Sequence, residues 1–290
     1  MLVLARGCYS SVAPIAKIDP GLVDSGTSVD PPAADACVRR KPWEGPGFTG
    51  LIPFDASNAL VLNGDRYFKA EFDTTGADAS DPTLGRVIAW HETGLLKDLW
   101  DTAPPYVGLE PWDDPGVTAA YITKGGTGRQ IIISRFRRWI HEGDQWGAGS
   151  IVDDWLINDA GPGELDGQVP WGGPGVTAAY FNPTGDSFYA ISQNKGWLRR
   201  TADPDPKNWT WSPDGGFNLA LAAPWSSAPV VAGQHPYDGK GVTTAYYIGP
   251  KFFVVSVDKM WVHDGKRWTA SGALKDMPGW ASAPAASCGP

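Results

Sequence analysis

The chain has 290 residues, enough for one large domain or two ordinary ones, and contains 36 Gly, 26 Pro and 15 Trp. Only 19% of the residues are charged, which excludes a helical bundle built from Glu, Lys and Ala, and the many turn formers favour an all-β fold. The net charge of −8 argues against a nucleic-acid partner, because neutralising phosphates needs a basic face.

Residues 1–36 are interpreted as a residual export signal followed by a flexible tether. The start, MLVLARGC, resembles the tail of a bacterial lipoprotein signal in which Cys8 would be acylated, although MLVLA is short for the apolar core of such a signal. Either the natural start lies upstream within a longer signal, or Cys8 is an ordinary residue. We expect an extracellular or cell-envelope protein, secreted or lipid-anchored. No transmembrane segment is expected, because no apolar run approaches the roughly 20 residues that span a bilayer.

A nine-residue phrase occurs four times in the rest of the chain. The copies are PWEGPGFTG at 42–50, PWDDPGVTA at 111–119, PWGGPGVTA at 170–178 and PYDGKGVTT at 236–244, and their starts are 69, 59 and 66 residues apart. Self-similarity at such a period is typical of propellers and other repeat folds. The domain of residues 37–290 therefore divides into four units, at about 42–105, 111–165, 170–230 and 236–288.

Each unit continues with a pattern of short strands. In the fourth unit, YYI is followed by KFFVVSVDKMWVHDGKRWTASG, which predicts three further strands separated by two turns. A short amphipathic piece such as GLLKDLW or SIVDDWLI, one or two helical turns long, follows the last strand. The first unit has a longer loop before its last strand. Two positions are equivalent in all units, in the third strand (Phe68, Trp139, Trp197 and Trp261) and in the fourth (Trp90, Trp146, Trp211 and Trp268).

Four strands in each of four units predict an all-β fold, a four-bladed β-propeller with pseudo-four-fold symmetry. A single four-stranded blade cannot cover its own apolar faces, so the blades must stack and the ring must close. Large aromatic side chains suit this fold as wedges between blades. We therefore interpret most of the 15 Trp as packing residues and not as a ligand cage.

The units resemble the blades of the hemopexin-like domain family. The two VTAAY segments, 117–121 and 176–180, are similar to the family's opening strand, and NGDRYFKAE at 63–71 is similar to its hairpin. The resemblance covers residues 37–288. It implies a disulfide between Cys37 and Cys288 that ties the first blade to the last, and the places of these cysteines at the two ends of the domain allow that bond in an exported chain.

One position departs from the family. Where the family has Asp in the opening strand, all four units have Thr: Thr49, Thr118, Thr177 and Thr243. The resemblance implies that this strand lines a central tunnel that often holds an ion. Thr lacks the negative charge that helps to hold a hard cation, so we expect no cofactor beyond a weakly held tunnel ion, Ca²⁺ or Na⁺, or water in its place. The predicted tunnel-lining or ligand-binding residues are these four Thr with Tyr121, Tyr180 and Tyr246.

The predicted function is that of an exported, non-catalytic, lectin-like binding module that uses the propeller face or the axial tunnel. Its expected partner is a carbohydrate, a small molecule or an extracellular protein, since sugar C–H faces stack on exposed Trp. An enzyme with its site at the axial funnel is the alternative, with the same tyrosines and Tyr247 as candidates, so whether the chain is an enzyme stays open. No HExxH, paired CxxC or phosphate-loop motif is present, and no catalytic residue can be named.

The four histidines carry little functional signal. His141 and His263 follow the third-strand Trp by two residues, and we expect surface imidazoles that lie beside that Trp and beside Glu142 and Asp264. The two units that carry them stand opposite each other in a four-membered ring, so one metal ion is not expected to bridge them. Haem binding, suggested by the family's name, is a minor alternative.

Overall fold

The computed structural model describes the chain at residues 39–76, 78, 80–123, 129–147, 149–151, 164–203, 209–211 and 219–286. The chain divides into two compact units, Met1–Ala36 and Cys37–Pro290, and every described residue belongs to the second unit. Cys8, Cys37 and Cys288, for which lipidation and a disulfide are predicted, lie outside the described residues. Within the described part, we find no helix of the length and apolar character needed to cross a membrane.

Each unit predicted from the repeat is an antiparallel sheet, or blade, whose first four strands follow one another in chain order; in blades 2 and 3 a fifth short strand also pairs with the third strand, β9 with β7 and β14 with β12. Blade 1 consists of β1 (Gly50–Pro53), β2 (Asn58–Asn63), β3 (Arg66–Phe72) and β4 (Val87–Leu95). Blade 2 consists of β5 (Ala119–Ile122), β6 (Gln130–Ser134), β7 (Arg137–Glu142), β8 (Gln145–Trp146) and β9 (Ser150–Ile151). Blade 3 consists of β10 (Ala178–Phe181), β11 (Ser187–Ser192), β12 (Lys195–Arg200), β13 (Thr210–Trp211) and β14 (Leu219–Ala220). Blade 4 consists of β15 (Thr244–Ile248), β16 (Lys251–Ser256), β17 (Lys259–His263) and β18 (Trp268–Ala273).

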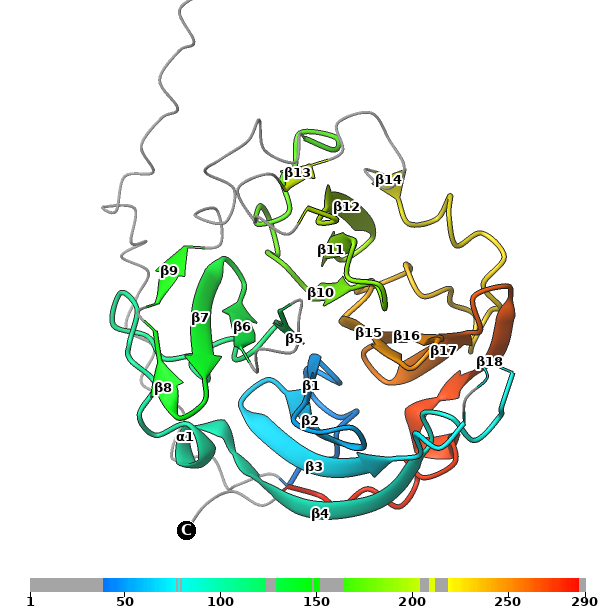
Figure 1. Ribbon diagram of the computed structural model, residues 1–290, viewed down its shortest axis with the longest axis horizontal. Helices are drawn as coiled ribbons and strands as arrows, with labels where there is room; N and C mark the ends of the chain where they lie inside the picture. The colour runs from blue at the N-terminus through cyan, green and yellow to red at the C-terminus, as the bar shows by residue number, and fades with distance from the viewer. Residues whose placement is uncertain are drawn as a thin grey trace, which may run out of the picture. The chain divides into compact units, whose positions relative to one another are not determined.

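The four blades form a ring with the first strand of each blade innermost (Figure 1). Strand β1 contacts β5 and β15, and β10 contacts the same two strands, so the inner strands follow one another all round the axis. The predicted four-bladed propeller is therefore confirmed. Helix α1 (Leu96–Leu99) confirms the predicted helical turn in GLLKDLW, and a second short turn, η3 (Leu274–Asp276), follows blade 4.

The repeated phrase forms the joint between neighbouring blades. Its apolar residue donates the backbone N–H to the carbonyl of the turn between the second and third strands of the preceding blade, at 2.9–3.1 Å: Val117 to Gly64, Val176 to Arg135, Val242 to Gln193, and Phe48 to Val257 across the ring closure. The preceding Gly has a φ of +69° to +83°, and a Cβ there would stand 2.4–2.6 Å from the backbone of that turn: Gly47, Gly116, Gly175 and Gly241. The phrase therefore needs Gly both for its backbone conformation and for the close approach of two blades.

Large aromatic side chains fill the blades between these joints. The predicted third-strand position is fully buried in every blade and pairs with an apolar residue of the second strand: Phe68 with Val61, Trp139 with Ile132, Trp197 with Ala190, and Trp261 with Val254. Truncating such a side chain to Ala would cost about 3–5 kcal/mol of folding free energy. The predicted aromatic packing of the propeller is thus present in all four blades.

A second set of tryptophans comes from the segments that connect the blades. Three of the four segments have the sequence Trp-x-x-Ala-Pro, at residues 100–104, 225–229 and 280–284. The Trp makes an edge-to-face contact with the fourth-strand Trp of the next blade, at 5.5–6.2 Å between ring centroids: Trp100 with Trp146, Trp225 with Trp268, and Trp280 with Trp90. In two segments the Pro carbonyl accepts the N–H of the buried third-strand indole, from Trp139 at 2.9 Å and from Trp261 at 2.7 Å.

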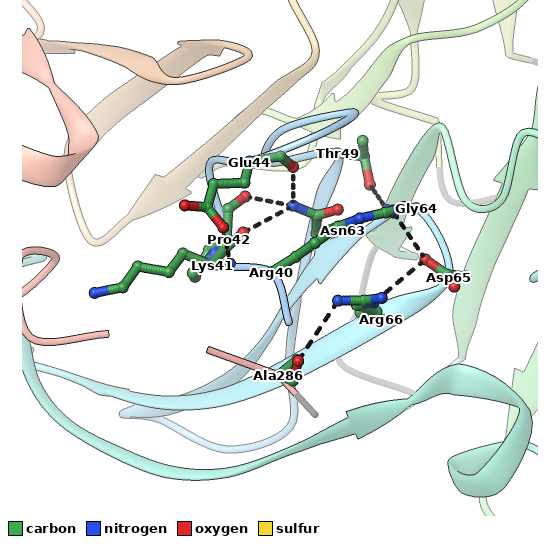
Figure 2. Close-up of polar contacts among 10 residues, drawn as sticks. All are labelled: Arg40, Lys41, Pro42, Glu44, Thr49, Asn63, Gly64, Asp65, Arg66 and Ala286. Atoms are coloured by element: carbon green, nitrogen blue, oxygen red, sulfur yellow. Dashed lines mark hydrogen bonds and ion pairs between the residues drawn. The ribbon is translucent and has the colours of Figure 1, made fainter. Parts of the chain in front are cut away.

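The ends of the described chain meet at the closure of the ring (Figure 2). Arg40 and Ala286 exchange two backbone hydrogen bonds, at 2.8 and 3.3 Å, and the Arg66 guanidinium donates to the Ala286 carbonyl at 3.5 Å. The amide Nδ2 of Asn63 donates at 2.8–3.1 Å to three carbonyls of the first phrase and the residue before it: Lys41, Pro42 and Glu44. These bonds tie both ends of the described part of the chain to blade 1. The disulfide that the resemblance implies stays a prediction.

The long loop of blade 1, residues 73–86 between β3 and β4, reaches blade 4, and we call it the strap. The corresponding connection in blade 4 spans only residues 264–267. Lys251 of β16 donates its ammonium to the strap carbonyls of Asp81 and, at 3.3 Å, Leu84. Gly85 has a φ of +80° and lies so close to the Phe253 ring that a Cβ would stand 2.3 Å from it. The strap is therefore packed against β16 of the last blade.

Candidate functional site

The predicted inner-strand tyrosines lie between different pairs of blades. Tyr121 packs on Phe188 between blades 2 and 3, Tyr180 on Phe252 between blades 3 and 4, and Tyr246 on Phe48 between blades 4 and 1. Each ring belongs to a separate hydrophobic cluster. Burial raises the pKa of all three phenols. The structure therefore does not bring these three side chains together at one mouth of the tunnel, as an enzyme at the axial funnel would require.

The predicted threonines lie at the joints between blades. Their hydroxyls accept a backbone N–H from the turn of their own blade at 2.8–3.0 Å: Thr49 from Gly64, Thr118 from Arg135, Thr177 from Gln193, and Thr243 from Val257. Three of them also donate to a carbonyl of the next blade at 2.6–2.8 Å: Thr118 to Val176, Thr177 to Val242, and Thr243 to Phe48. A carboxylate could accept the N–H but could not donate to the next blade, so an Asp at these positions would lose the second bond. Ligand or ion binding at these residues stays a prediction.

Between blades 3 and 4 lies a cavity of about 250 Å³, which we call the aromatic cleft. Its lining comes from inner strands, outer strands and the connecting segment after blade 3: Tyr180, Tyr189, Pro224, Trp225, Ser227, Tyr247, Phe252, His263 and Trp268. Seven of these nine side chains carry a ring system of Tyr, Trp, Phe or His. Sequence analysis singled out Tyr180 and Tyr247 from this set, and the structure places both in the same cleft.

The rings of the aromatic cleft contact one another in a continuous series. Tyr180 and Tyr189 are paired across β10 and β11 and stack at 4.9 Å with an interplanar angle of 13°. Tyr247 meets Tyr180 at 5.9 Å and Phe252 at 4.8 Å. Trp225 extends the series, at 6.0 Å from Phe252. Contacts of this kind hold each ring in a fixed orientation, so the cleft presents preformed aromatic faces.

The far side of the aromatic cleft consists of Trp268 and His263. These two residues face each other across β17 and β18, with ring centroids 5.1 Å apart. Trp268 is only half-buried, and Trp225 meets it edge-to-face. The connecting segment holds Trp225 in place because the backbone N–H of Trp225 donates to the carbonyl of the fully buried Leu221 at 3.1 Å. Both ends of the ring series are thus anchored in the fold.

The described residues that line the aromatic cleft carry no formal charge. Burial is the main cause that raises the pKa of Tyr247 to about 12, and it raises the pKa of Tyr180 and Tyr189 as well. Burial also lowers the pKa of His263, although the nearby Asp264 acts in the opposite direction. The phenols and the imidazole are therefore neutral near pH 7. The described lining contains no Lys, Arg, Asp or Glu.

Blade 2 repeats the His–Trp pair of blade 4. His141 and Trp146 face each other across β7 and β8, with ring centroids 4.6 Å apart, and Trp146 meets Trp100 between blades 1 and 2. The carboxylate that acts on His141 is Asp144, whereas the expected Glu142 forms an ion pair with Arg129 at 2.8 Å. Among the described residues, no group of three or more His, Cys, Asp or Glu side chains is placed to hold a metal ion.

Sequence analysis missed Tyr189, Phe252 and Trp225 as parts of a site. The strand register contains a signal for Tyr189. The inner-strand residues Ile52, Tyr121, Tyr180 and Tyr246 pair with Leu60, Ile131, Tyr189 and Phe253, respectively. Of these four pairs, only the pair in blade 3 consists of two tyrosines. The repeated Trp-x-x-Ala-Pro segment could have located Trp225. The remaining contacts join residues of different blades, which no local pattern reveals.

Comparison with known proteins finds likeness in structure alone. No family model matches the chain, and no curated protein matches it in sequence. Among solved structures, the hemopexin fold protein CP4 from cow pea superposes with a TM-score of 0.55 at 11% identity, covering 82% of this chain and 96% of that one. The fold is that of a hemopexin-like propeller. A 2S albumin seed protein from Dolichos (TM-score 0.53, 11% identity, 82% and 99% covered) and a plant lectin with two metal binding sites from Cicer arietinum (0.53, 11%, 81% and 96%) are similar to this hemopexin-like chain. At this identity the likeness shows the fold alone.

Proposed function

We propose that this hemopexin-like chain is a non-catalytic binding module, and that the aromatic cleft holds one pyranose ring of a glycan. The observation that carries the proposal is the series of fixed aromatic rings around a cavity of about 250 Å³. Pockets for drug-sized ligands occupy roughly 300–1,000 Å³, so this cleft suits a single ring-sized group at the end of a larger molecule.

The chemistry of the lining favours a neutral polyol over an ion. A charged group would enter the cleft without a counter-charge, because no acidic or basic side chain is among its described lining residues. A pyranose has an apolar C–H face that stacks on an indole or phenol, and hydroxyls that exchange hydrogen bonds with polar groups. The cleft offers partners of both kinds, with Trp268 for stacking and the Tyr247 and Ser227 hydroxyls for hydrogen bonding.

We further propose that the protein meets its glycan outside the cell or at the cell envelope. The support for this location is the resemblance of the first residues to a lipoprotein export signal. The sequence predicts two other classes of partner, a small molecule and an extracellular protein. Either would leave simple sugars without effect on the protein.

The test is titration of the full chain with a panel of methyl glycosides, with binding monitored by tryptophan fluorescence and ligand-observed NMR. At least one glycoside should bind saturably. Trp268→Ala should weaken that binding at least about tenfold, because it removes the half-exposed stacking surface. Trp146→Ala is the matched control, since it truncates the equivalent Trp of blade 2 and should leave the affinity unchanged.

A second variant separates stacking from hydrogen bonding. Tyr247→Phe keeps the ring and deletes one hydroxyl, and we expect it to weaken sugar binding about fivefold, the usual effect of one lost hydrogen bond. Both variants should keep the melting behaviour of a folded propeller, checked by near-UV circular dichroism. Equal losses in Trp268→Ala and Trp146→Ala would mean that stability and not the cleft is being measured. If none of the glycosides binds saturably, the glycan proposal is wrong.

A further inference from the structure

A larger cavity, of about 580 Å³, lies on the other side of blade 4, and we call it the strap cleft. The strap of blade 1 forms one wall, and β16, β17 and β18 form the other. The floor is apolar and deeply buried, and it consists of Phe253, Met260, Val262 and Trp280. Such a floor would take an apolar group of appreciable size out of water, which stabilises a complex by roughly 25 cal/mol for each Å² buried.

Basic side chains surround this apolar floor. The lining includes Lys251, Arg86 and Arg267, against one carboxylate, Asp264. The carboxylate is engaged, because its Oδ1 accepts the backbone N–H groups of Lys266 and Arg267, each at 2.8 Å. Its Oδ2 lies 3.9 Å from the Arg267 guanidinium. The cleft therefore carries an excess of positive charge within a chain whose net charge is −8.

Lys251 is the cation that lies deepest in the strap cleft. The residue is only 4% exposed, and its ammonium donates to two strap carbonyls, those of Asp81 and Leu84. An ammonium has three donors, so one N–H of Lys251 has no acceptor among the described residues. Burial is the main cause that lowers the pKa of this Lys, although the nearby Asp81 and Asp264 carboxylates act in the opposite direction. A buried cation with an unfilled donor would gain from an anionic partner inside the cleft.

We propose that the strap cleft binds a small amphipathic anion, an apolar chain or ring that carries one carboxylate, with the Lys251 ammonium as its counter-charge. The apolar part lies on Phe253 and Trp280, and the carboxylate accepts the remaining N–H of Lys251. This site is separate from the aromatic cleft, whose described lining has no charged side chain, and it does not depend on glycan binding. Because the strap forms one wall, the bound anion also holds the strap against blade 4.

Calorimetric titration with octanoate tests the charge preference. We expect octanoate to bind the full chain saturably with one site, and octylammonium, of the same chain length and opposite charge, to show no saturable binding. Trp225→Ala should leave octanoate binding unchanged, which separates this site from the aromatic cleft. Equal affinity for both amphiphiles, or no saturable octanoate binding, would overturn the proposal.

Two Lys variants test the assigned counter-charge. Lys251→Met keeps most of the side-chain length but removes the ammonium, and we expect it to weaken octanoate binding about tenfold or more. Lys195→Met is the matched control: Lys195 of blade 3 is also largely buried and donates to the Leu165 carbonyl at 3.1 Å, but does not line the strap cleft. Unchanged affinity in Lys251→Met would contradict the assignment.

Two further measurements do not need a variant of a buried residue. Ala270→Trp places an indole in the strap cleft from an exposed position of β18 and should block octanoate while the propeller stays folded. In the wild-type chain, octanoate should slow amide hydrogen exchange in peptides of residues 73–86 and leave the turn at 143–144 unchanged. Exchange in the strap that octanoate does not slow would overturn the proposed site.

Discussion

The two flanks of blade 4 are built from the same strands but differ in charge, since one borders a neutral cleft and the other a positively charged one. Phe252 and Phe253 are consecutive in β16 and point to opposite faces of the sheet, as neighbours in a strand must. Phe252 lines the neutral aromatic cleft shared with blade 3, whereas Phe253 lines the positively charged strap cleft shared with blade 1. The difference comes from the neighbouring blade, because blade 3 contributes tyrosines and blade 1 contributes a strap.

The joints that hold the two flanks together do not differ. Val242 joins blade 4 to blade 3 and Phe48 joins blade 1 to blade 4 through the same backbone hydrogen bond, next to a glycine in the same conformation. The joint is formed by backbone atoms together with the Gly and Thr of the repeated phrase. The side chains around the joint can therefore differ from blade to blade. The propeller can therefore vary the space between two blades without altering how they are connected.

The largest expected effect on the free energy of unfolding comes from substitutions at the joints between blades. Gly241→Ala puts a Cβ 2.4 Å from the Gln193 backbone at a φ of +69°, and we expect a loss of about 4 kcal/mol in the free energy of unfolding. Gly47→Ala, at the joint on the other flank, should cost the same. Gly233→Ala is the control, with a φ of +79° but no atom within 4 Å, and should cost only about 1 kcal/mol. Urea unfolding measures all three, and unequal losses at the two joints would show that the flanks differ in their backbone as well.

A pH dependence of intermediate size is expected from the histidine of the aromatic-cleft flank and from its counterpart in blade 2. Burial lowers the pKa of His263, so the unfolded chain, whose imidazole titrates near about 6.5, binds the proton more tightly than the folded chain. The stabilisation is complete above that pH and is lost as the pH falls through it toward the folded pKa. The pKa of His141 is lowered for the same reason in blade 2. Each of His263→Gln and His141→Gln should reduce the fall in Tm between pH 7 and 5, and an NMR titration that places either imidazole above its ordinary pKa would contradict this.

The smallest expected effect concerns a single hydroxyl. The Tyr246 Oη is buried between blades 4 and 1 without a partner among the described residues. Tyr246→Phe removes this unsatisfied group and should raise the free energy of unfolding by roughly 1 kcal/mol. Tyr247→Phe, whose phenol lines the aromatic cleft on the other flank, should leave stability nearly unchanged and affect only sugar binding. Thermal unfolding of the two variants makes the comparison, and a loss of stability in Tyr246→Phe would show that its hydroxyl has a partner.

The inner-strand tyrosines show which part of the candidate site is predictable from the sequence. Tyr180 and Tyr247 were singled out because they lie near the ends of inner strands, and both line the aromatic cleft. Tyr121 and Tyr246 met the same criterion and lie between other blades. The inner-strand sequence around each Tyr is similar in these units. The surroundings of the Tyr rings differ because the residues that pack against them come from the next blade.

The ring of four blades is predictable from the sequence, since the repeated Pro-aromatic-turn-Gly-apolar-Thr phrase requires a local backbone conformation that only Gly adopts easily and that forms the same joint each time. Tertiary structure alone decided where cavities lie and what chemistry lines them. A cleft depends on side chains that residues far apart in the chain bring together, as Lys251 and the strap do across some 170 positions. Local patterns specify hydrogen bonds within a strand or turn, whereas the space between two blades follows from the shapes of both.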